Sequence, residues 1–404
     1  MAPEFSVIHA TPGSHQGLVV LTVGRNTRAI HSNSEFEAII ALNASGEIVW
    51  TKMMDFALMD CRQSRRGSLL VMGTTGVAEE LAFDGTLVNR WYCPDRFPEG
   101  TTGTPLPTMK IHHAISELSD GLLATVSIRE HPLENPEPDW QRFMSDTIVL
   151  FDREGTIHME LDLIDLLDTA RITTDGRLPY WRFQGWSETM DWSHANSIIE
   201  DPADGGLLLS LRHQDAIIKV SRSGELVWIL GNPLDWGGQW QDRLLKIDGG
   251  PPFFHQHDVS ITSYGELMLF DNGANPDQPI DTHQSSVLCF RIDEAAMTAT
   301  ETWRFGSDFL PYSTYVSGVC ELDNKNVFVA CTGLKHDSNG RRVKLPPKGV
   351  GAIEVFEVAR TGPNTGTCVF HARLEDKNAL PDAGWHGFRP EFLDTQTAAR
   401  LLSA

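Results

Sequence analysis

The chain has 404 residues, of which 41% are hydrophobic and 22% are charged, and its formal net charge is −21. This composition supports a packed globular core, and the acidic balance argues against nucleic acid or an anionic membrane as a partner, because phosphate contacts need a basic face. The first residues, MAPEFSVIHATPGSHQ, lack the basic and apolar regions of a secretion signal, and no apolar run approaches the ~20 residues that cross a bilayer. We therefore expect a cytoplasmic protein without membrane contact.

A unit of two hairpins recurs along the chain. One hairpin has a glycine turn followed by alternating apolar residues, as in NASGEIVW (43–50), DREGTIHMEL (152–161) and SRSGELVWIL (221–230). Another hairpin precedes it, clearly at 194–211 and less clearly at 9–23. Six units of four short strands are typical of a propeller. The sequence predicts one all-β domain over residues 1–404, a six-bladed β-propeller with short helical and loop insertions.

Two insertions and one closing strand complete the predicted architecture. Residues 131–143 are rich in proline and acidic residues and read as a loop. The other insertion, 161–190, begins with LDLIDLLDTARI (161–172), whose apolar spacing predicts a helix over one face. We expect SVIHA (6–10) to pair with strands of the last unit, because ring closure removes an exposed edge.

Three histidines occupy the same position of the repeat. His113, His194 and His257 begin the first strand of their units, and His9 takes the corresponding place in the first unit by a looser alignment. The first strand of a blade normally lines the central channel, so equivalent positions should meet around the axis. The sequence therefore predicts a ring of imidazoles in the channel.

Hairpin counting adds neighbours to this ring. The turn within DPADGG (201–206) sets Arg212 opposite His194 and Ser210 opposite Asn196. Because side chains alternate along a strand, His194 and Asn196 should point the same way. The next hairpin similarly sets Asn272 across from His257.

Such a cluster suits a tetrahedral oxyanion. A guanidinium with amide and imidazole donors makes strong charge-assisted bonds to an anion, and a neutral histidine there could be a nucleophile toward a transferable anionic group. Three imidazoles could instead hold zinc, although a fixed guanidinium opposes a bound cation. A water-filled ring without catalytic function is the remaining interpretation. The six cysteines show no metal-binding spacing, and we expect no cofactor.

Three segments resemble the bacterial aryl-sulfate sulfotransferases, a family of six-bladed propeller enzymes that work without PAPS. They are DWSHANSIIEDPADGGLLLSLRHQDAIIKV (191–220), FFHQHDVSI (253–261) and, more weakly, KIHHAISEL (110–118). The resemblance implies ping-pong transfer of a sulfuryl group from an aryl sulfate donor to a phenolic acceptor. His257 would be the nucleophile that becomes sulfated, and it would have to be neutral to attack.

The resemblance also implies that His194, Asn196, Arg212 and His113 hold the sulfuryl oxygens. The predicted catalytic residues are His257, His194, Arg212 and His113, the predicted substrate-binding residues are Asn196, Asn272 and His255, and no metal ligand is predicted. Five aromatic residues are candidates for stacking on an aryl ring, with burial in the core as the alternative for each: Trp181, Phe183, Trp186, Trp192 and Phe253.

Two other functions fit parts of the pattern. A metal-dependent lyase or hydrolase would use His113, His194 and His257 as ligands, and bound zinc would distinguish it from a transferase. A non-catalytic scaffold would use the propeller for binding alone and leaves the histidine and arginine cluster unexplained. Well-known members of the family are exported, whereas no export signal is visible here, which bears on substrate identity. The oligomeric state does not follow from the sequence.

Overall fold

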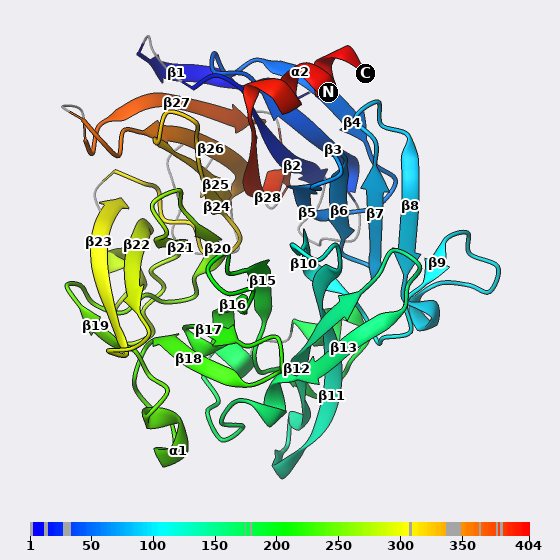
Figure 1. Cartoon of the computed structure of the whole chain (residues 1–404), viewed down its shortest axis with the longest axis vertical. Helices are drawn as coiled ribbons and strands as arrows, with labels where there is room; N and C mark the ends of the chain where they lie inside the picture. Colours follow the sequence, from blue (N-terminus) through cyan, green and yellow to red (C-terminus); the bar gives the residue numbers. More distant parts are fainter. Residues whose placement is uncertain are drawn as a thin grey trace.

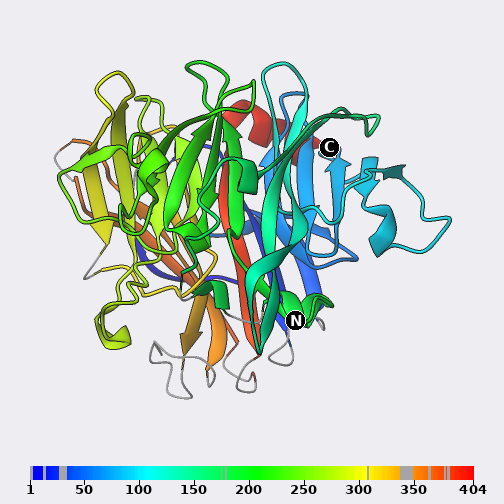
Figure 2. The ribbon, with the colours of Figure 1, turned by 90° about the horizontal axis from the view of Figure 1, so that it is seen from below.

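The chain forms a ring of antiparallel sheets around a central axis, as expected of a β-propeller (Figure 1). This computed structural model describes residues 3–11, 15–26, 34–173, 175–177, 180–306, 309–336, 349–362, 365–376, 379 and 383–404. Viewed edge-on, the strands run between the two faces of the disc (Figure 2). The described strands form five hydrogen-bonded sheets, of which the nine-stranded one consists of two meanders joined by a single parallel bridge between Gly351 and Gly384. The resulting six meanders are numbered here as blades 1 to 6.

The first three blades contain the following strands, given from the axis outward. Blade 1 contains β28 (Gly384–Leu393), β2 (Leu18–Asn26), β3 (Ser34–Leu42) and β4 (Ile48–Met53). Blade 2 contains β5 (Leu58–Gln63), β6 (Leu69–Gly73), β7 (Val77–Leu81), β8 (Leu87–Tyr92) and β9 (Thr104–Pro105). Blade 3 contains β10 (His112–Glu117), β11 (Leu123–Glu137), β12 (Trp140–Phe151) and β13 (Ile157–Asp162), and β14 (Thr189–Asp191) pairs with β12.

The other three blades follow the same order. Blade 4 contains β15 (Ala195–Glu200), β16 (Leu207–Leu211), β17 (Ala216–Val220) and β18 (Leu226–Gly231). Blade 5 contains β20 (His257–Ile261), β21 (Leu267–Asp271), β22 (Ser286–Asp293), β23 (Thr298–Gly306) and β19 (Lys246–Asp248). Blade 6 contains β24 (Gly318–Glu321), β25 (Val327–His336), β26 (Val350–Val358), β27 (Cys368–Glu375) and β1 (Ser6–Ala10).

Helices are few and short. The α-helices are α1 (Gly238–Gln241) and α2 (Thr395–Ser403), and single 3-10 turns lie at Pro94–Arg96, Leu163–Asp165, Asp175–Arg177, Trp181–Gln184, Arg212–Gln214 and Ile280–Thr282. The Asp394 side chain caps α2 by accepting a bond from Thr397 N at 2.7 Å. Within the described ranges, no helix has the length and apolarity needed to cross a bilayer.

Apolar side chains between neighbouring blades form the core. Strands in the middle of a blade are buried on both faces, so both sets of alternating side chains are apolar. In β6, Leu69 and Val71 pack toward blade 1, while Leu70 and Met72 pack toward blade 3. Six such clusters fill the six interfaces of the ring. Each fully buried aliphatic side chain contributes about 1.5–3 kcal/mol to folding.

The innermost strands of neighbouring blades contact one another all the way around the ring. The contacting pairs are β5 with β10, β10 with β15, β15 with β20, β20 with β24, β24 with β28 and β28 with β5. The side chains at the start of these strands therefore meet near the axis.

The two ends of the chain close this ring. As predicted, β1 pairs antiparallel with β27 of the last blade. The hairpin predicted at residues 9–23 is wrong, because β28 from the C-terminal end is the inner partner of β2. His9 accordingly lies on the exposed outer strand β1, cross-strand from His371, and not in the channel. The alternation of apolar residues in β2 did not reveal which distant strand would pair with it.

Both predicted insertions differ from their expected form. Residues 131–143 are not a loop but the extended end of the β11–β12 hairpin, with His131 paired to Phe143. The predicted helix at 161–172 is reduced to the single turn Leu163–Asp165, which follows the strand residue Asp162. Leu163 and Leu167 pack into the core between blades 3 and 4, so their helix-like spacing reflects burial of an irregular segment.

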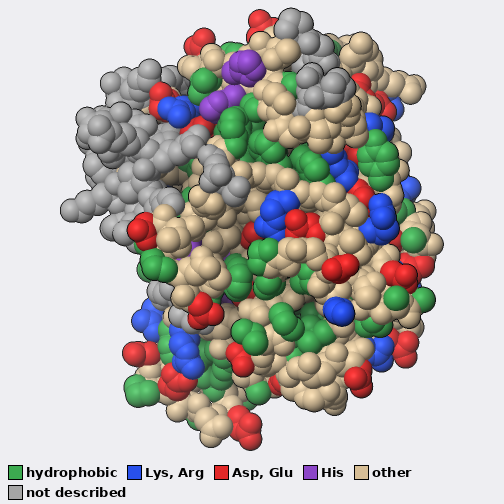
Figure 3. All heavy atoms as spheres, turned by 90° about the vertical axis from the view of Figure 1, so that its left-hand side faces the viewer, with side chains coloured by type: hydrophobic (Ala, Val, Ile, Leu, Met, Phe, Trp, Pro, Cys, Tyr) green, Lys and Arg blue, Asp and Glu red, His purple; other side chains and the backbone are tan. Residues whose placement is uncertain are grey.

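The surface shown in Figure 3, which faces outward over blades 5 and 6, mixes acidic, basic and hydrophobic side chains. Among the side chains coloured on this face, the basic ones do not form a continuous stripe (Figure 3).

Candidate active site

The four predicted catalytic side chains gather where β10, β15 and β20 start. The His113 and His194 rings are 4.8 Å apart between centroids. Phe388 of β28 has its ring 6.1 Å from that of His113 and 6.0 Å from that of His257. Arg212 completes the cluster from the end of β16 and is only 8% exposed.

The hydrogen bonds of His257 define its tautomer. Its Nδ1 lies 2.7 Å from Asn272 Oδ1 and 3.0 Å from His255 O, both of which are acceptors. Nδ1 must therefore carry the proton, which leaves the lone pair on Nε2. Burial and the nearby charge of Arg212 hold the pKa of His257 well below its ordinary value. The ring is neutral at physiological pH, with Nε2 free of a proton.

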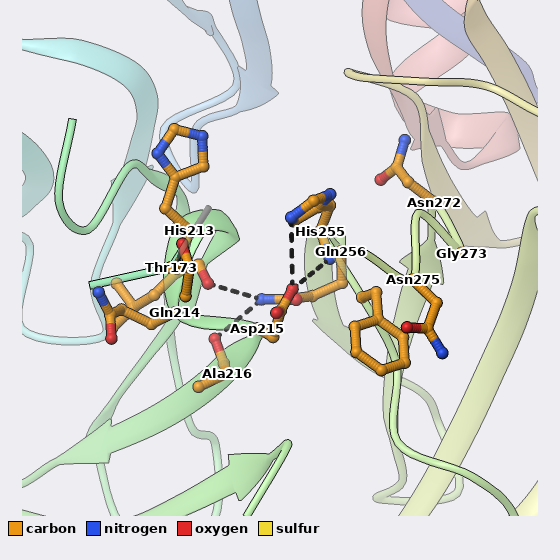
Figure 4. A network of polar contacts seen from close by, with 12 residues as sticks. Thr173, His213, Gln214, Asp215, Ala216, His255, Gln256, Asn272, Gly273 and Asn275 are labelled. Carbon is orange, nitrogen blue, oxygen red and sulfur yellow. Dashed lines mark hydrogen bonds and ion pairs between the residues drawn. The ribbon is translucent and has the colours of Figure 1, made fainter. Parts of the chain in front are cut away.

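The residues on either side of His257 attach this part of β20 to its two neighbouring blades. Gln256 Nε2 donates to Ala216 O at 2.8 Å and to Leu211 O at 3.2 Å, both in blade 4 (Figure 4). On the other side, Asp258 accepts from Val319 N of blade 6 at 2.8 Å. The sequence Gln-His-Asp thus holds the imidazole between two side chains that anchor the strand.

His194 is oriented by a carboxylate and by its backbone. Its Nδ1 lies 2.5 Å from Asp191 Oδ2, so Nδ1 carries a proton that it donates to the carboxylate. The backbone of His194 has φ +50°, and that of His113 has φ +57°. Left-handed backbone is rare for residues other than glycine, and here it occurs at the equivalent position of two blades. Such strain clusters at functional sites.

The group of residues that most resembles a metal site is Asp191, His194 and His213, whose candidate ligand atoms all lie within 4.8 Å of one another. Two donors on one tetrahedral zinc ion at bond lengths of about 2.0–2.1 Å stand about 3.3 Å apart. The contact of 2.5 Å between His194 and Asp191 is shorter and corresponds to a shared proton. His213 Nδ1 is already 2.7 Å from the Asp191 backbone oxygen. The geometry therefore fits a carboxylate that orients imidazoles better than it fits a cation site.

The electrostatics around His113 also favour a neutral ring. Burial, together with the neighbouring His194, His112 and His257, holds its pKa well below the ordinary value. Arg212 beside these rings adds a guanidinium, which is effectively always protonated. A fixed guanidinium in a buried cluster of imidazoles is an arrangement suited to a small oxyanion.

A known protein family matches most of this chain. The arylsulfotransferase family, described as "Arylsulfotransferase (ASST)", matches residues 6–382.

The chain belongs to the arylsulfotransferase family.

Two curated relatives carry the name arylsulfate sulfotransferase AssT. The protein of Escherichia coli O6:H1 is 28% identical over 176 residues, which are 38% of this chain and 29% of that protein. The protein of Lelliottia amnigena is 24% identical over 318 residues, 66% of this chain and 52% of that protein. The chain thus matches about half, or less, of the length of these relatives. A crystal structure of a protein of unknown function from Bacteroides caccae has a TM-score of 0.51 at 11% identity, covering 93% of this chain and 99% of that one, and shares the fold.

Two of the residues predicted to bind substrate make hydrogen bonds within the framework. The Asn196 amide donates to Gln256 O at 2.7 Å, next to His257. Asn272 Oδ1 accepts from His257 Nδ1, and Asn272 Nδ2 donates to the backbone oxygen of Ser313 at 2.8 Å. The predicted pairing of Asn196 with Ser210 is one residue out, because a bulge in β15 places Ser197 there. The bulge also interrupts the alternation that would have aligned Asn196 with His194.

Arg212 occupies the position that hairpin counting suggested. Arg212 N donates to His194 O at 3.1 Å, so the two residues are opposite, as predicted. His255 lies on the approach to β20, where its N–H donates to Asp215 Oδ1 at 2.7 Å (Figure 4). Its ring is 6.4 Å from His213 and its Nε2 is 3.8 Å from the same Asp215 oxygen.

Sequence reasoning missed several residues that contact the cluster. Tyr180, from the 161–190 insertion, has its ring 4.9 Å from that of His194. Asp191 and Phe388 were also missed, the latter because β28 was not expected in the channel. Of the proposed aromatic walls, Trp181, Trp192 and Phe253 are buried, whereas Phe183 is 78% exposed. Trp186 packs against Trp181 with the two rings 5.6 Å apart.

Proposed function

We propose that this protein transfers a sulfuryl group from an aryl sulfate to a phenolic acceptor, in two steps, through a sulfated His257. In the first step Nε2 of His257 attacks sulfur, the bond from sulfur to the phenolic oxygen breaks, and the phenol leaves with a proton. In the second step the oxygen of another phenol attacks the sulfur of sulfohistidine, and the electron pair of the nitrogen–sulfur bond returns to Nε2.

The tautomer of His257 is the observation that carries this proposal. Two oxygen acceptors hold the proton on Nδ1, and burial with Arg212 holds the pKa down, so Nε2 is a nucleophile without a separate general base. Asn272 has the orienting role that a carboxylate has in a triad, but it adds no charge that would favour the imidazolium. Because Nε2 of His257 already lacks a proton, it can attack the aryl sulfate directly, although the substrate supplies no base to remove one.

The surrounding donors suit the charge of the sulfuryl group. Arg212 offers a fixed guanidinium, and the imidazoles of His113 and His194 lie in the same buried cluster. Donors placed before the reaction stabilise developing charge at little reorganisation cost, and removal of one typically costs about 10²–10³ in kcat. The match to the arylsulfotransferase family over most of the chain supports the same chemistry. The cytoplasmic location and the identities of donor and acceptor stay predictions.

The decisive experiment is intact-mass spectrometry after incubation with p-nitrophenyl sulfate, followed by peptide mapping. We expect an adduct of one SO₃ on His257, its loss on addition of a phenol, and no adduct in His257→Ala. His255→Ala is the matched control, because this histidine lies two residues away, and it should retain the adduct. An adduct that persists in His257→Ala, or a protein that forms none with any aryl sulfate, would overturn the proposal.

A further inference from the structure

A second imidazole lies directly behind His113, on the same strand. His112 and His113 face each other through their Nδ1 atoms at 2.5 Å, with their rings nearly perpendicular at 84°. Two imidazole nitrogens at this distance must share one proton, because one has to donate and the other accept. The contact occupies Nδ1 of His113 and leaves its Nε2 for a substrate.

The other side of His112 meets a buried carboxylate. His112 Nε2 is 2.9 Å from Asp146 Oδ1, and their side chains are 2% and 3% exposed. The contact is close enough for an ion pair but is not aligned as a hydrogen bond, since neither atom has a hydrogen-bond partner among the described residues. Asp146 Oδ2, by contrast, accepts from Ser193 Oγ at 2.5 Å and from Ala195 N at 2.7 Å. This carboxylate is therefore fixed in place, with one oxygen directed to His112.

The proposed reaction needs a place to keep one proton. The leaving phenolate takes up a proton in the first step, and the acceptor phenol releases one in the second. Between the two steps the enzyme therefore carries one proton fewer than at rest. His257 cannot hold it, because its Nε2 is then bonded to sulfur.

We propose that Asp146, His112 and His113 form a proton relay in which His113 exchanges the proton with the phenol and the ion pair of His112 with Asp146 stores it. This inference rests on the proposed function and adds the proton path and two residues to it. His113 is the catalytic residue of the relay, and His112 and Asp146 act through it.

The proton inventory balances in both steps. At rest His112 is an imidazolium paired with Asp146, and His113 is neutral with its proton on Nε2. When the phenolic oxygen takes that proton, the Nδ1 proton of His112 moves to Nδ1 of His113. His112 is then neutral, and Nε2 of His113 is free to act as a base. In the second step the acceptor phenol returns a proton to Nε2, and the Nδ1 proton moves back.

His113 remains neutral in both states of this relay, in agreement with its buried surroundings. The groups that face it are His112, His194 and His257, with Lys110 further away. An imidazolium at His113 would meet these groups without a carboxylate of its own, whereas His112 has Asp146. The structure thus separates the residue that touches substrate from the residue that carries the charge.

The test compares sulfation rates from two aryl sulfates whose phenolate leaving groups differ in basicity. We compare wild type, His112→Phe and Asp146→Asn on phenyl sulfate, whose phenolate needs a proton, and on p-nitrophenyl sulfate, whose phenolate does not. Each variant should lose about 100-fold or more in the rate of His257 sulfation from phenyl sulfate, and less than about 5-fold from p-nitrophenyl sulfate. His131→Phe is the control, because it removes another His–Asp pair of blade 3, with Nε2 2.8 Å from Asp162, and it should leave both rates unchanged.

An equal loss on both sulfates, or no loss, would overturn the relay while sulfation of His257 in wild type would still support the proposed function. Absence of sulfation in wild type would overturn both. Wild type alone provides a second measurement if the variants do not fold. With phenyl sulfate in H₂O–D₂O mixtures, transfer of two protons predicts a curved dependence of rate on deuterium fraction, and a straight line would contradict the relay.

Discussion

His257 and its immediate neighbours illustrate how single residues control the chemistry of this site. The ring is oriented by Asn272 and His255 O, and its charge state is controlled by burial and Arg212. His194 differs from His257, because its Nδ1 donates to the carboxylate of Asp191. A neutral partner therefore orients the nucleophile His257, whereas an anionic partner orients His194.

Replacement of Asn272 by alanine should impair sulfation of His257. The ring would keep only the His255 backbone oxygen as acceptor, so Nε2 would be less well aligned, and we expect about a 10- to 100-fold lower single-turnover rate. The rate is measured from the growth of the SO₃ adduct with time. Asn89→Ala, which removes an amide bonded to Arg153 O far from the axis, should leave the rate unchanged. An unaltered rate in Asn272→Ala would show that the tautomer is set by other groups.

Arg212 should control the pH dependence of the reaction. Because the neutral ring attacks, activity is present above the pKa of His257 and is lost as pH falls through it. Burial and Arg212 lower this pKa, so the acid limb of kcat/KM in wild type should lie well below the reference pKa of ~6.5. Arg212→Gln should move the limb upward and should cost about 2–4 kcal/mol in transition-state stabilisation. A pH–rate profile of both proteins checks this, and an acid limb that does not move would refute the role of the charge.

At the scale of elements, the strand β28 connects the first blade to the axis. Its Arg389 bonds Asp60 of β5, with Nε 2.7 Å from Oδ1, and donates to Asn196 O of β15 at 3.3 Å. Burial opposes ionisation of Asp60, but the charges of Arg389 and Arg62 prevail and lower its pKa. The inner strands are thus joined by a buried ion network as well as by apolar packing.

Removal of Arg389 should destabilise the protein more than the loss of one contact suggests. Arg389→Met leaves a buried carboxylate with Arg62 as its remaining cationic partner, and we expect a loss of about 3 kcal/mol in the free energy of unfolding. Asp60→Asn in the same chain should restore part of it. Urea unfolding measures both. Arg129→Met, which breaks a largely exposed pair with Glu160, should cost less than about 1 kcal/mol, and equal losses in the two variants would contradict the argument.

At the scale of the whole molecule, the ring is closed by strands from both ends of the chain. β1 is exposed along its length and adds an edge to blade 6, whereas β28 is the inner strand of blade 1. The two ends therefore contribute unequally to stability. In a ring, an inner strand touches both neighbouring blades, and an outer strand touches only its own.

Truncation should reveal this inequality. Removal of residues 1–10 deletes β1 and the buried Phe5 and should lower stability by about 2 kcal/mol while the protein still folds and is sulfated. Removal of residues 384–404 deletes β28, and with it Phe388 and Arg389, and should abolish cooperative folding. Circular dichroism during thermal unfolding distinguishes the outcomes. A folded protein without β28 would show that closure of blade 1 is dispensable.

The sequence predicted much of the candidate site because the motifs are local. The positions of His194 opposite Arg212 and of His257 beside Asn272 follow from hairpins whose turns are short. His112 could have been noticed from the pair of histidines in KIHHAISEL, but its importance depends on Asp146, 34 residues away on another strand. Nothing in the local pattern identifies that carboxylate.

The sequence by itself determined the all-β class, the repeated hairpins and the shared register of three histidines, because alternating apolar residues and glycine turns are short-range features. Only the tertiary structure decided that β28 lines the channel of blade 1, that the 131–143 segment extends a hairpin, and that His9 lies at the outer edge. These outcomes depend on pairing between strands far apart in the chain or on the packing of irregular segments. Several apolar strands could pair with a given strand as judged from their local sequence, and closure of the ring determines which of them does.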